Sequence, residues 1–519
     1  MRAIDRDARR VSISLRCPAS FLAMFRLFRS RFRLTIAAAL SVALVAPSPL
    51  PVAAQDSPDG TAATADAPPV AIPKKRYKLE DLPRDANGYL LPAVWDIMEE
   101  QAKAAPRSNE ARVFAERHVY QQYYKQYAGW TAPAPLPVTA GRLRNLPDIP
   151  TQPRFAITDP VWPEKAGQAA VCMWEDDKLA AISVGVDDNN AMDLPYWRLL
   201  SKKYNGIKIT WYLITHNIGG VVSKGRVVGA GKWETWQAML DEGYHLGSHS
   251  VTHNHCPVPA DGWPGPDFEA AESARSLDAN LKGQRTLVFA YPGSGVQVFA
   301  PHRVKGQNYM RPSVAKYYIA ARGGGGKAIN RANMIDYMSV ASTTGAVPLL
   351  LDPNNKTAPD QNLHNLFAAD PKHTYHDFYR GWADVFIHFI NNGKDFEKNP
   401  FNVAFEKIFA FIDANRDKLW HAYFDEIARY AAERDAATLT VDEATDAVIK
   451  LTLVTKMEPA LFDYPLSVKV RLPATWKGFS AKQNGNLVTG VELQHEGGSF
   501  AMLKIVPDRG QVTLTPAGK

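Results

Sequence analysis

Apolar residues recur along this chain with two different periods, and the change of period divides the chain into segments. Between residues 153 and 434, short apolar runs typical of strands alternate with stretches in which apolar positions recur every three or four residues, as in helices. Predicted strands cover 179–186, 208–214, 245–250, 286–291, 318–321, 337–341 and 383–390, and predicted helices include 194–203, 233–242 and 268–281. This alternation predicts parallel strands covered by helices, as an open sheet or a barrel.

Helical spacing also precedes this region, at 92–104 and 109–127, and follows it, at 420–434. We expect the first two helices to form an extension, 76–152, that packs on the main domain. Five aromatic residues lie on or just after the second helix: Tyr120, Tyr123, Tyr124, Tyr127 and Trp130. They would suit a sugar-binding groove, but their helical spacing favours a place in the core.

After residue 436 the apolar period becomes two. Short alternating runs at 447–455, 466–472, 491–495, 500–506 and 511–515 are separated by glycine- and proline-containing turns. This pattern predicts a small all-β, sandwich-like module over 437–519. Binding of carbohydrate and simple stabilisation of the main domain are both open roles for it.

The first 54 residues have the form of a secretory signal peptide. Arginines precede an apolar run at 34–46, and the small residues Val52, Ala53 and Ala54 form a cleavage site. Because the run is short and broken by prolines, we expect no stable membrane span after cleavage. The sequence predicts export to the periplasm or the medium, and residues 55–75, rich in Ala, Pro, Asp and Ser, predict a disordered linker.

The net charge of +7 belongs to this leader. Residues 1–54 hold nine Arg, no Lys and two Asp, which leaves 51 basic and 51 acidic residues in the remainder. A formally neutral remainder argues against a nucleic-acid partner. Beyond the leader only Cys172 and Cys256 remain, and two thiols do not make a disulfide scaffold, although they could pair.

The residues most informative about chemistry are Asp187-Asp188 and the spaced pair His249 and His253. Two imidazoles and one carboxylate can bind a divalent metal ion and leave a position open for water, while the second carboxylate accepts that water's proton. These residues, together with Pro292 and His388, fall at the carboxyl ends of predicted strands. Barrel enzymes place their chemistry at that end, so the barrel is the favoured fold.

These motifs resemble those of the polysaccharide deacetylases of carbohydrate esterase family 4, whose catalytic unit is the NodB-homology domain. The resemblance rests on four segments in this order: Val184–Asn189 (VGVDDN), Gly247–His253 (GSHSVTH), Phe289–Gly293 (FAYPG) and Phe386–Phe389 (FIHF). The resemblance covers residues 179 to 390, and an extension to 434 is the alternative. It implies a distorted (β/α) barrel over 153–436.

The resemblance also implies a role for each matched residue. Asp188, His249 and His253 would hold a divalent metal, with Zn²⁺ expected, and Asp187 would be the general base. The oxyanion would lie near the backbone N–H of Tyr291. His388 would give a proton to the leaving group.

Two departures from the family pattern stand out. Asn189 replaces the usual Gly after the Asp pair, and Ala290 stands where many members carry an Arg that pairs with the catalytic Asp. Arg322, at the end of another predicted strand, is our candidate replacement, with an ordinary strand-end Arg as the alternative. For orienting His388 the candidates are Asp384 and Asp377.

The sequence thus predicts an exported, metal-dependent deacetylase that removes N-acetyl or O-acetyl groups from a polysaccharide or oligosaccharide. Two alternatives stay open. One is a hydrolase of the same fold that acts on another non-peptide C–N bond, and the other is a carbohydrate-binding protein with a weakened site.

Overall fold

The computed structural model describes residues 82–518, apart from 87–88, 108, 139–147, 220–221, 224–225, 228–229, 255, 296–309, 324–325, 345–347, 356, 373–375 and 391–397. Contacts divide the chain into Met1–Ala67 and Pro68–Lys519, and all described residues belong to the second unit. The predicted signal peptide (1–54) and linker (55–75) therefore lie outside the described residues. Within the described part, no helix has the length and apolar character needed to cross a bilayer.

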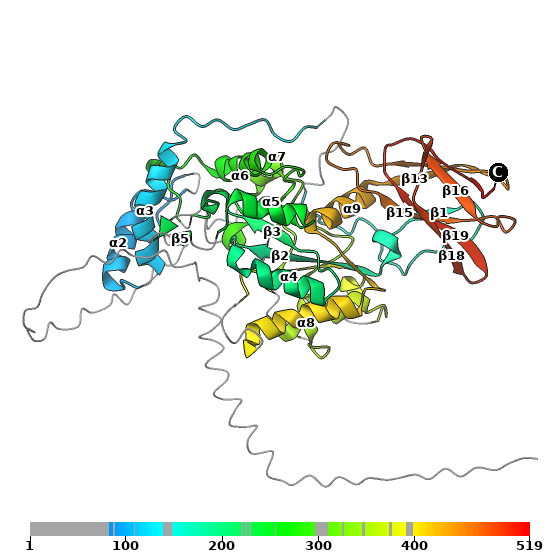
Figure 1. Cartoon of the computed structure of the whole chain (residues 1–519), viewed down its shortest axis with the longest axis horizontal. Coiled ribbons are helices and arrows are strands. Elements are labelled where there is room, and N and C mark those ends of the chain that lie inside the picture. Colours follow the sequence, from blue (N-terminus) through cyan, green and yellow to red (C-terminus); the bar gives the residue numbers. More distant parts are fainter. Residues whose placement is uncertain are drawn as a thin grey trace, which may run out of the picture. The chain divides into compact units, whose positions relative to one another are not determined.

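Seven parallel strands form the central sheet, in the order β10, β11, β2, β3, β6, β7, β8 (Figure 1). Their bounds are β2 (Ala180–Asp187), β3 (Thr210–Leu213), β6 (His245–Ser248), β7 (Val288–Ala290), β8 (Ala320–Arg322), β10 (Thr343–Thr344) and β11 (Trp382–Ile387). Every residue of β2 is buried, as its nearly continuous apolar run predicts for a strand covered on both faces.

The two edges of this sheet approach each other through one short segment. Val340 forms a parallel bridge with Arg322 of β8, and β10, a few residues further along, pairs with β11. The sheet therefore curls into a distorted (β/α) barrel, which confirms the predicted fold class. Three further strand pairs complete the region: β9 (Ile329–Asn330) with β11, β12 (Leu419–His421) with β2, and β4 (Val222–Ser223) with β5 (Arg226–Val227).

Helices cover the barrel strands. They are α4 (Leu194–Lys203), α5 (Trp233–Asp241), α6 (Pro266–Asn280), α7 (Arg311–Tyr317), α8 (Pro400–Ala414) and α9 (Phe424–Ala436). The inner face of α4 shows why they form: Leu194, Trp197 and Leu200 are buried at helical spacing. Trp197 packs edge-to-face on Trp211 of β3, within one core cluster.

Two predicted elements of the barrel differ in the structure. The predicted helix at 420–434 starts later, because residues 419–421 pair as β12 with the first half of β2 and Tyr423 is extended. The predicted strand at 337–341 is reduced to the bridge at Val340. Residues 419–421 pair with a neighbouring strand that local spacing does not reveal. At 337–339 a turn, in which the Ser339 N–H donates to Asp336 O at 3.0 Å, takes the place of the strand.

The N-terminal extension contains α2 (Val94–Ala104) and α3 (Asn109–Lys125), as predicted. Val94, Trp95 and Met98 pack with Cys256 and Val258 in a small core. Aromatic residues of α3 and of the turn after it pack against α6: Tyr124 on the helix is 1% exposed, and Tyr127 in the turn lies edge-on to Phe268. This confirms the core interpretation for Tyr124.

The C-terminal region forms two antiparallel sheets. One has the order β13 (Thr438–Ala444), β14 (Ile449–Val454), β20 (Val512–Pro516), β16 (Phe479–Gln483), β17 (Asn486–Leu487), and the other β1 (Ala169–Val171), β15 (Leu466–Arg471), β19 (Gly498–Ile505), β18 (Gly490–His495). Buried residues alternate along β14, as the period of two predicted. Strand β13 was not predicted because it is largely exposed and polar.

The strand β1 joins the C-terminal sheet although it precedes the barrel in the sequence. Its residues pair antiparallel with Val468–Val470 of β15. Strand β1 therefore links the segments on the two sides of the boundary expected at residue 437. One core cluster contains both Trp382 of the barrel and Leu451 of the C-terminal sheets.

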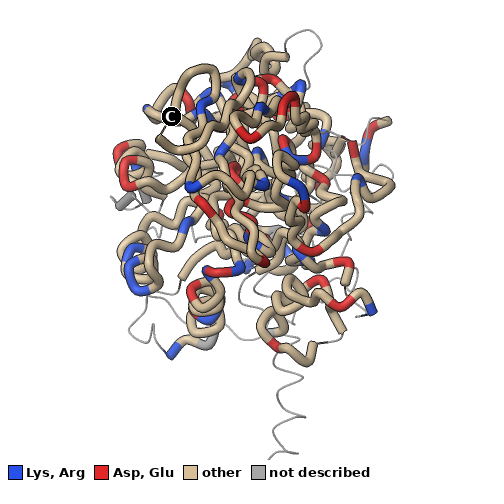
Figure 2. Tube along the Cα trace, turned by 90° about the vertical axis from the view of Figure 1, so that its right-hand side faces the viewer, with Lys and Arg blue, Asp and Glu red and all other residues tan. Residues whose placement is uncertain are grey.

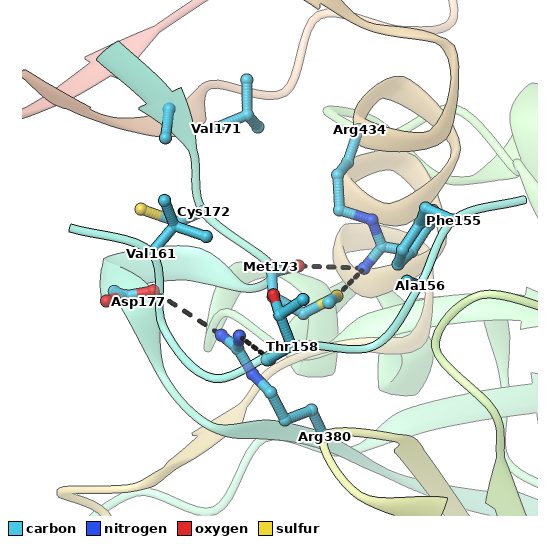
Figure 3. Close-up of a pocket in the computed structure, with 11 residues that line it drawn as sticks. Phe155, Ala156, Thr158, Val161, Val171, Cys172, Met173, Asp177, Arg380 and Arg434 are labelled. Atoms are coloured by element: carbon cyan, nitrogen blue, oxygen red, sulfur yellow. Dashed lines mark hydrogen bonds and ion pairs between the residues drawn. The ribbon is translucent and has the colours of Figure 1, made fainter. Parts of the chain in front are cut away.

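A cavity of about 250 Å³ lies where residues 155–173, β1 and α9 meet (Figure 3). Buried charges surround it. Lys469 Nζ lies 2.6 Å from Asp177 Oδ2, Arg380 Nη2 lies 3.6 Å from Asp177 Oδ1, and Arg434 pairs with the buried Asp435 at 2.6 Å. Basic and acidic residues are interspersed over the described trace (Figure 2), in keeping with the balanced charge outside the leader.

The two cysteines of the described region do not form a disulfide. Both thiols are reduced and buried. The Cys172 thiol lies 3.7 Å from Met502 Sδ, whereas Cys256 packs in the core beneath α2.

Candidate metal centre

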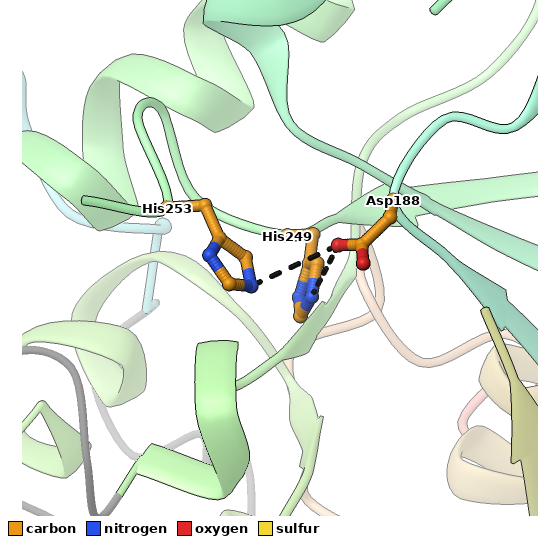
Figure 4. Close-up of side chains that lie close together, drawn as sticks. All are labelled: Asp188, His249 and His253. Atoms are coloured by element: carbon orange, nitrogen blue, oxygen red, sulfur yellow. Dashed lines mark ion pairs between the residues drawn. The ribbon is translucent and has the colours of Figure 1, made fainter. Parts of the chain in front are cut away.

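The carboxyl ends of β2 and β6 bring the two sequence motifs together. Asp187 is the last residue of β2 and Asp188 follows it, while His249 follows β6 directly. Because β2 and β6 both flank β3 in a parallel sheet, their carboxyl ends meet at the same end of the barrel. The predicted ligands therefore lie side by side (Figure 4).

The turn after β2 adopts a left-handed conformation. Asp188 has φ 69° and Asn189 has φ 53°, a region that glycine enters freely and asparagine tolerates. The Asn189 side chain donates to Ile214 O at 3.0 Å and accepts from Ile214 N at 2.6 Å. Asn189 thus takes the backbone conformation of the glycine it replaces and ties the turn to the end of β3.

The loop after β6 carries both histidines. Ser250 (φ 70°) and His253 (φ 49°) are also left-handed. The Ser250 backbone N–H donates to Ser248 Oγ at 3.2 Å, and the His253 N–H donates to Ser250 Oγ at 3.0 Å. These local bonds fold the loop back, so that both imidazoles point toward Asp188.

The ligand atoms of Asp188, His249 and His253 all lie within 4.8 Å of one another. Asp188 Oδ1 is 3.5 Å from His249 Nε2 and 3.7 Å from His253 Nε2. Ligands placed tetrahedrally around Zn²⁺ at about 2.1 Å would be about 3.4 Å apart. The two distances from Asp188 therefore suit a small divalent ion.

The protonation of His249 also suits metal binding. Its Nδ1 lies 2.8 Å from Ala290 O, and because a carbonyl only accepts, Nδ1 carries the proton and Nε2 presents a lone pair. Burial lowers the pKa of His249 to about 4. The ring is therefore neutral near pH 7, the form that binds metals.

Asp187 has different neighbours from Asp188. It is 2% exposed and forms an ion pair with Arg322 Nη2 at the end of β8. The Arg322 guanidinium lies 4.1 Å above the Phe386 ring, while Asp187 Oδ1 is buried with no hydrogen bond. The contact between Arg322 and Asp187, expected because Ala290 cannot make it, is confirmed.

His388 lies at the same end of the barrel. It follows Ile387, which pairs with Val186, the residue before Asp187. The ring is half-buried and packs edge-on against Phe386, and the His388 carbonyl accepts from Asn190 Nδ2. The end of β11 is thus tied to the turn that carries Asp188.

The structure does not support the expected role of Tyr291 as an oxyanion donor. Its backbone N–H donates to Arg322 O at 3.1 Å, and its hydroxyl donates to Met338 O at 2.9 Å. The ladder between β7 and β8 continues one residue beyond the strands and occupies the N–H. Burial raises the pKa of the Tyr291 hydroxyl, as expected for a core residue.

The two acidic candidates for orienting His388 have other partners. Asp384 accepts a hydrogen bond from Ser183 Oγ of β2, and burial raises its pKa to about 6. Asp377 has a side chain 65% exposed and pairs with Arg331 at 3.2 Å. The partners that the structure records for these two carboxylates are therefore Ser183 and Arg331, and their action on His388 stays a prediction.

Glu269 is a residue of the site that the sequence interpretation missed. It is fully buried on α6 and accepts hydrogen bonds from Val251 N (3.0 Å), Thr252 N (3.0 Å), Thr252 Oγ1 (2.7 Å) and Trp263 Nε1 (3.1 Å). Burial raises its pKa. The available signal was a glutamate amid the apolar positions of α6, which needs donors from another element.

The remaining histidines near the motif have structural partners. His245 lies 2.6 Å from Asp425 and stacks on Tyr423. His216 lies beside the metal loop, since its N–H donates to Val251 O at 2.9 Å, and burial lowers its pKa to about 4. His255 lies outside the described residues.

Residues 187–306 match the sequence model of the polysaccharide deacetylase family. A curated relative from a Bacillus species, named a gellan lyase, is 32% identical over 386 residues, which is 72% of this chain and 14% of that protein. The chain thus spans a small part of the relative's length.

Solved structures with similarity include the peptidoglycan deacetylase PdaC from Bacillus subtilis, 16% identical, covering 50% of this chain and 94% of that one with a TM-score of 0.27. A family 4 acetyl xylan esterase from Clostridium thermocellum is 13% identical, with coverage of 48% and 89% and a TM-score of 0.25. TM-scores this low leave the fold to rest on the strand order itself. The match over 187–306 and the motifs at the barrel end support a polysaccharide deacetylase domain in this chain.

Proposed function

We propose that this protein is a metal-dependent deacetylase that hydrolyses N-acetyl or O-acetyl groups of a polysaccharide or oligosaccharide. The observation that carries the proposal is the arrangement of three metal-ligand atoms within 4.8 Å beside a separate buried carboxylate, Asp187. Metal-assisted hydrolysis needs both parts: ligands for an ion and an unligated base.

A divalent ion, with Zn²⁺ expected, would activate water and polarise the acetyl carbonyl when bound by Asp188, His249 and His253. Asp187 accepts the proton of the water that attacks the carbonyl carbon. Arg322 forms an ion pair with Asp187 and so orients its carboxylate.

His388 then donates a proton to the leaving nitrogen or oxygen as its bond to the carbonyl carbon breaks. Acetate and the deacetylated sugar are the products, and the proton held by Asp187 returns to solvent. No covalent bond to the protein is required.

A polysaccharide substrate is supported by the deacetylase family match and by the relative named for gellan. Because the chain corresponds to 14% of that relative, the lyase activity in its name is not part of the proposal. Hydrolysis of another C–N bond and carbohydrate binding without turnover remain the alternatives.

The experiment is acetate release from acetylated chitooligosaccharide, peptidoglycan and acetylated xylan, each with and without a chelator. We expect release from at least one substrate, loss of release with chelator, and recovery on adding Zn²⁺. Polymer binding without release from any of them would favour the binding protein. Release unaffected by chelator would contradict metal dependence.

We also propose export to the periplasm or the medium, supported by the leader at 1–54. N-terminal sequencing of the mature protein is expected to start at Gln55. An unprocessed N-terminus in protein recovered from the cytoplasm would contradict this.

A further inference from the structure

The loop that carries His253 needs support from outside itself. Ser250 and His253 both have positive φ, at 70° and 49°, a conformation that residues other than glycine hold only where their surroundings enforce it. His253 is also the more exposed of the two histidine ligands, since its side chain is 18% exposed and that of His249 is 2% exposed. The contacts on either side of His253 therefore decide how well it is positioned.

The inner support comes from the barrel. Glu269 of α6 accepts the backbone N–H groups of Val251 and Thr252 and the Thr252 hydroxyl. These bonds secure the residues before His253 but not those after it.

The outer support comes from α3 of the N-terminal extension. The Tyr124 hydroxyl accepts a hydrogen bond from Asn254 Nδ2 at 2.9 Å and lies 3.3 Å from Thr252 Oγ1. Thr252 and Asn254 are the two residues that flank His253. Because Tyr124 is 1% exposed, water does not compete for these bonds.

A second contact fixes α3 itself. The Asp261 carboxylate, in the same connection between β6 and α6, accepts from Trp95 Nε1 (2.7 Å), from Arg117 Nη2 (3.0 Å) and from Gln121 Nε2 (2.7 Å). Donors on α2 and α3 thus converge on one largely buried carboxylate. The extension is attached to the segment that it supports.

We propose that the N-terminal extension is a working part of the metal centre and that Tyr124 is a positioning residue for His253. The proposal rests on the proposed metal-dependent function. The segment that matches the deacetylase family, 187–306, does not include the extension, so the centre of this chain is completed by residues outside its family domain.

The test is Tyr124→Phe in the full-length protein, with Tyr127→Phe as the matched control. Phenylalanine keeps the ring packing of Tyr124 and removes only the hydroxyl. The Tyr127 hydroxyl, in the turn that follows α3, lies 3.1 Å from the Tyr123 hydroxyl. Its removal is a matched loss of one hydroxyl away from the loop. Zn²⁺ affinity, measured by competition with a chromophoric chelator, is expected to fall about tenfold to a hundredfold in Tyr124→Phe and to stay unchanged in the control.

The metal-free proteins supply the second measurement. We expect the two variants to have matching melting temperatures, and hydrogen exchange at residues 250–254 to be faster only in Tyr124→Phe. Asp261→Asn weakens the attachment of α3 and leaves residues 250–254 unchanged. It is expected to lower Zn²⁺ affinity, as Tyr124→Phe does.

Equal Zn²⁺ affinity and equal exchange in Tyr124→Phe and Tyr127→Phe would overturn the positioning role. If the wild-type protein binds no divalent ion, the proposed function fails instead. In that case the exchange comparison still decides whether Tyr124 holds the loop.

Discussion

Two adjacent aspartates at the end of β2 have different surroundings, and this difference separates their roles. Asp187 ends the strand, is buried and pairs with Arg322. Asp188 enters a left-handed turn and faces His249 and His253. These different surroundings are the basis for the two proposed roles, metal binding for Asp188 and proton transfer for Asp187.

Asp187→Asn is expected to retain Zn²⁺ and to lower kcat by about 100-fold to 10 000-fold, because the amide cannot accept the proton. Asp188→Asn is the matched control and should lose Zn²⁺ affinity. Metal content by mass spectrometry and acetate release measure both effects. A variant at Asp187 that lost metal but kept its turnover would contradict the assignment.

Arg322→Met is expected to lower the free energy of unfolding by about 3–5 kcal/mol, because it leaves the Asp187 carboxylate buried without its cation. Arg198→Met is the control: its pair with Glu242 is exposed, so the cost should stay below about 1 kcal/mol. Urea unfolding gives both values.

Adding Asp187→Asn to Arg322→Met should recover part of the lost stability, since the unpaired charge is then gone. An additive double variant would show that the two residues do not interact.

At the scale of elements, apolar spacing predicted those helices and strands whose buried positions can be recognised from the element's own residues. The buried positions of α4 and the alternation in β14 follow directly from the residues. Features that depend on a distant partner were predicted wrongly. The strand β12 forms by pairing with β2, and the Tyr291 N–H donates to Arg322 O in the continuation of the β7–β8 ladder. Local periodicity carries no information about either pairing.

The β12 contact has a pH-dependent consequence. His421 Nε2 accepts from Lys208 N at 2.8 Å, and burial lowers the pKa of His421 to about 3. Between about pH 6.5 and pH 3 the unfolded chain binds a proton at this residue that the folded protein does not. His421 therefore contributes stability above pH 6.5 that is lost as the pH falls, at up to about 1.4 kcal/mol per pH unit.

His421→Gln, whose amide can replace both ring contacts, removes this titration. Its free energy of unfolding in urea should be lower than that of wild type at pH 8. The difference between the two free energies should become smaller as the pH falls from 6.5 to 4. His118→Gln, on the exposed face of α3, is the control and should run parallel to wild type. A constant gap for His421→Gln would contradict the prediction.

At the scale of the whole molecule, the barrel and the C-terminal sheets share one hydrophobic cluster. It contains Tyr212 and Trp382 of the barrel, Tyr430 of α9, and Leu451 and Val468 of the sheets. Strand β1 and the buried pair of Lys469 with Asp177 add polar links between them. These contacts favour stabilisation of the barrel as the role of the C-terminal module.

Deletion of residues 437–519 should therefore leave a barrel that does not fold stably, because it exposes this cluster to water. The full-length protein should unfold in a single calorimetric transition. Deletion of residues 1–67, which form the other unit, is the control and should not change the melting temperature. Two separate transitions, or a soluble truncated barrel that unfolds cooperatively, would contradict a shared core.

The sequence by itself determined the metal-ligand set and the class of fold. A carboxylate pair at a strand end and two histidines four positions apart are brought together by local geometry and by the parallel order of strands. Tertiary structure alone decided what holds the histidine loop: Glu269 of α6 accepts from the N–H groups of Val251 and Thr252, and Tyr124 reaches Asn254 across 130 positions. It also decided that β1 joins a sheet from the far end of the chain. Such contacts depend on how elements pack, and no short-range pattern of residues specifies that packing.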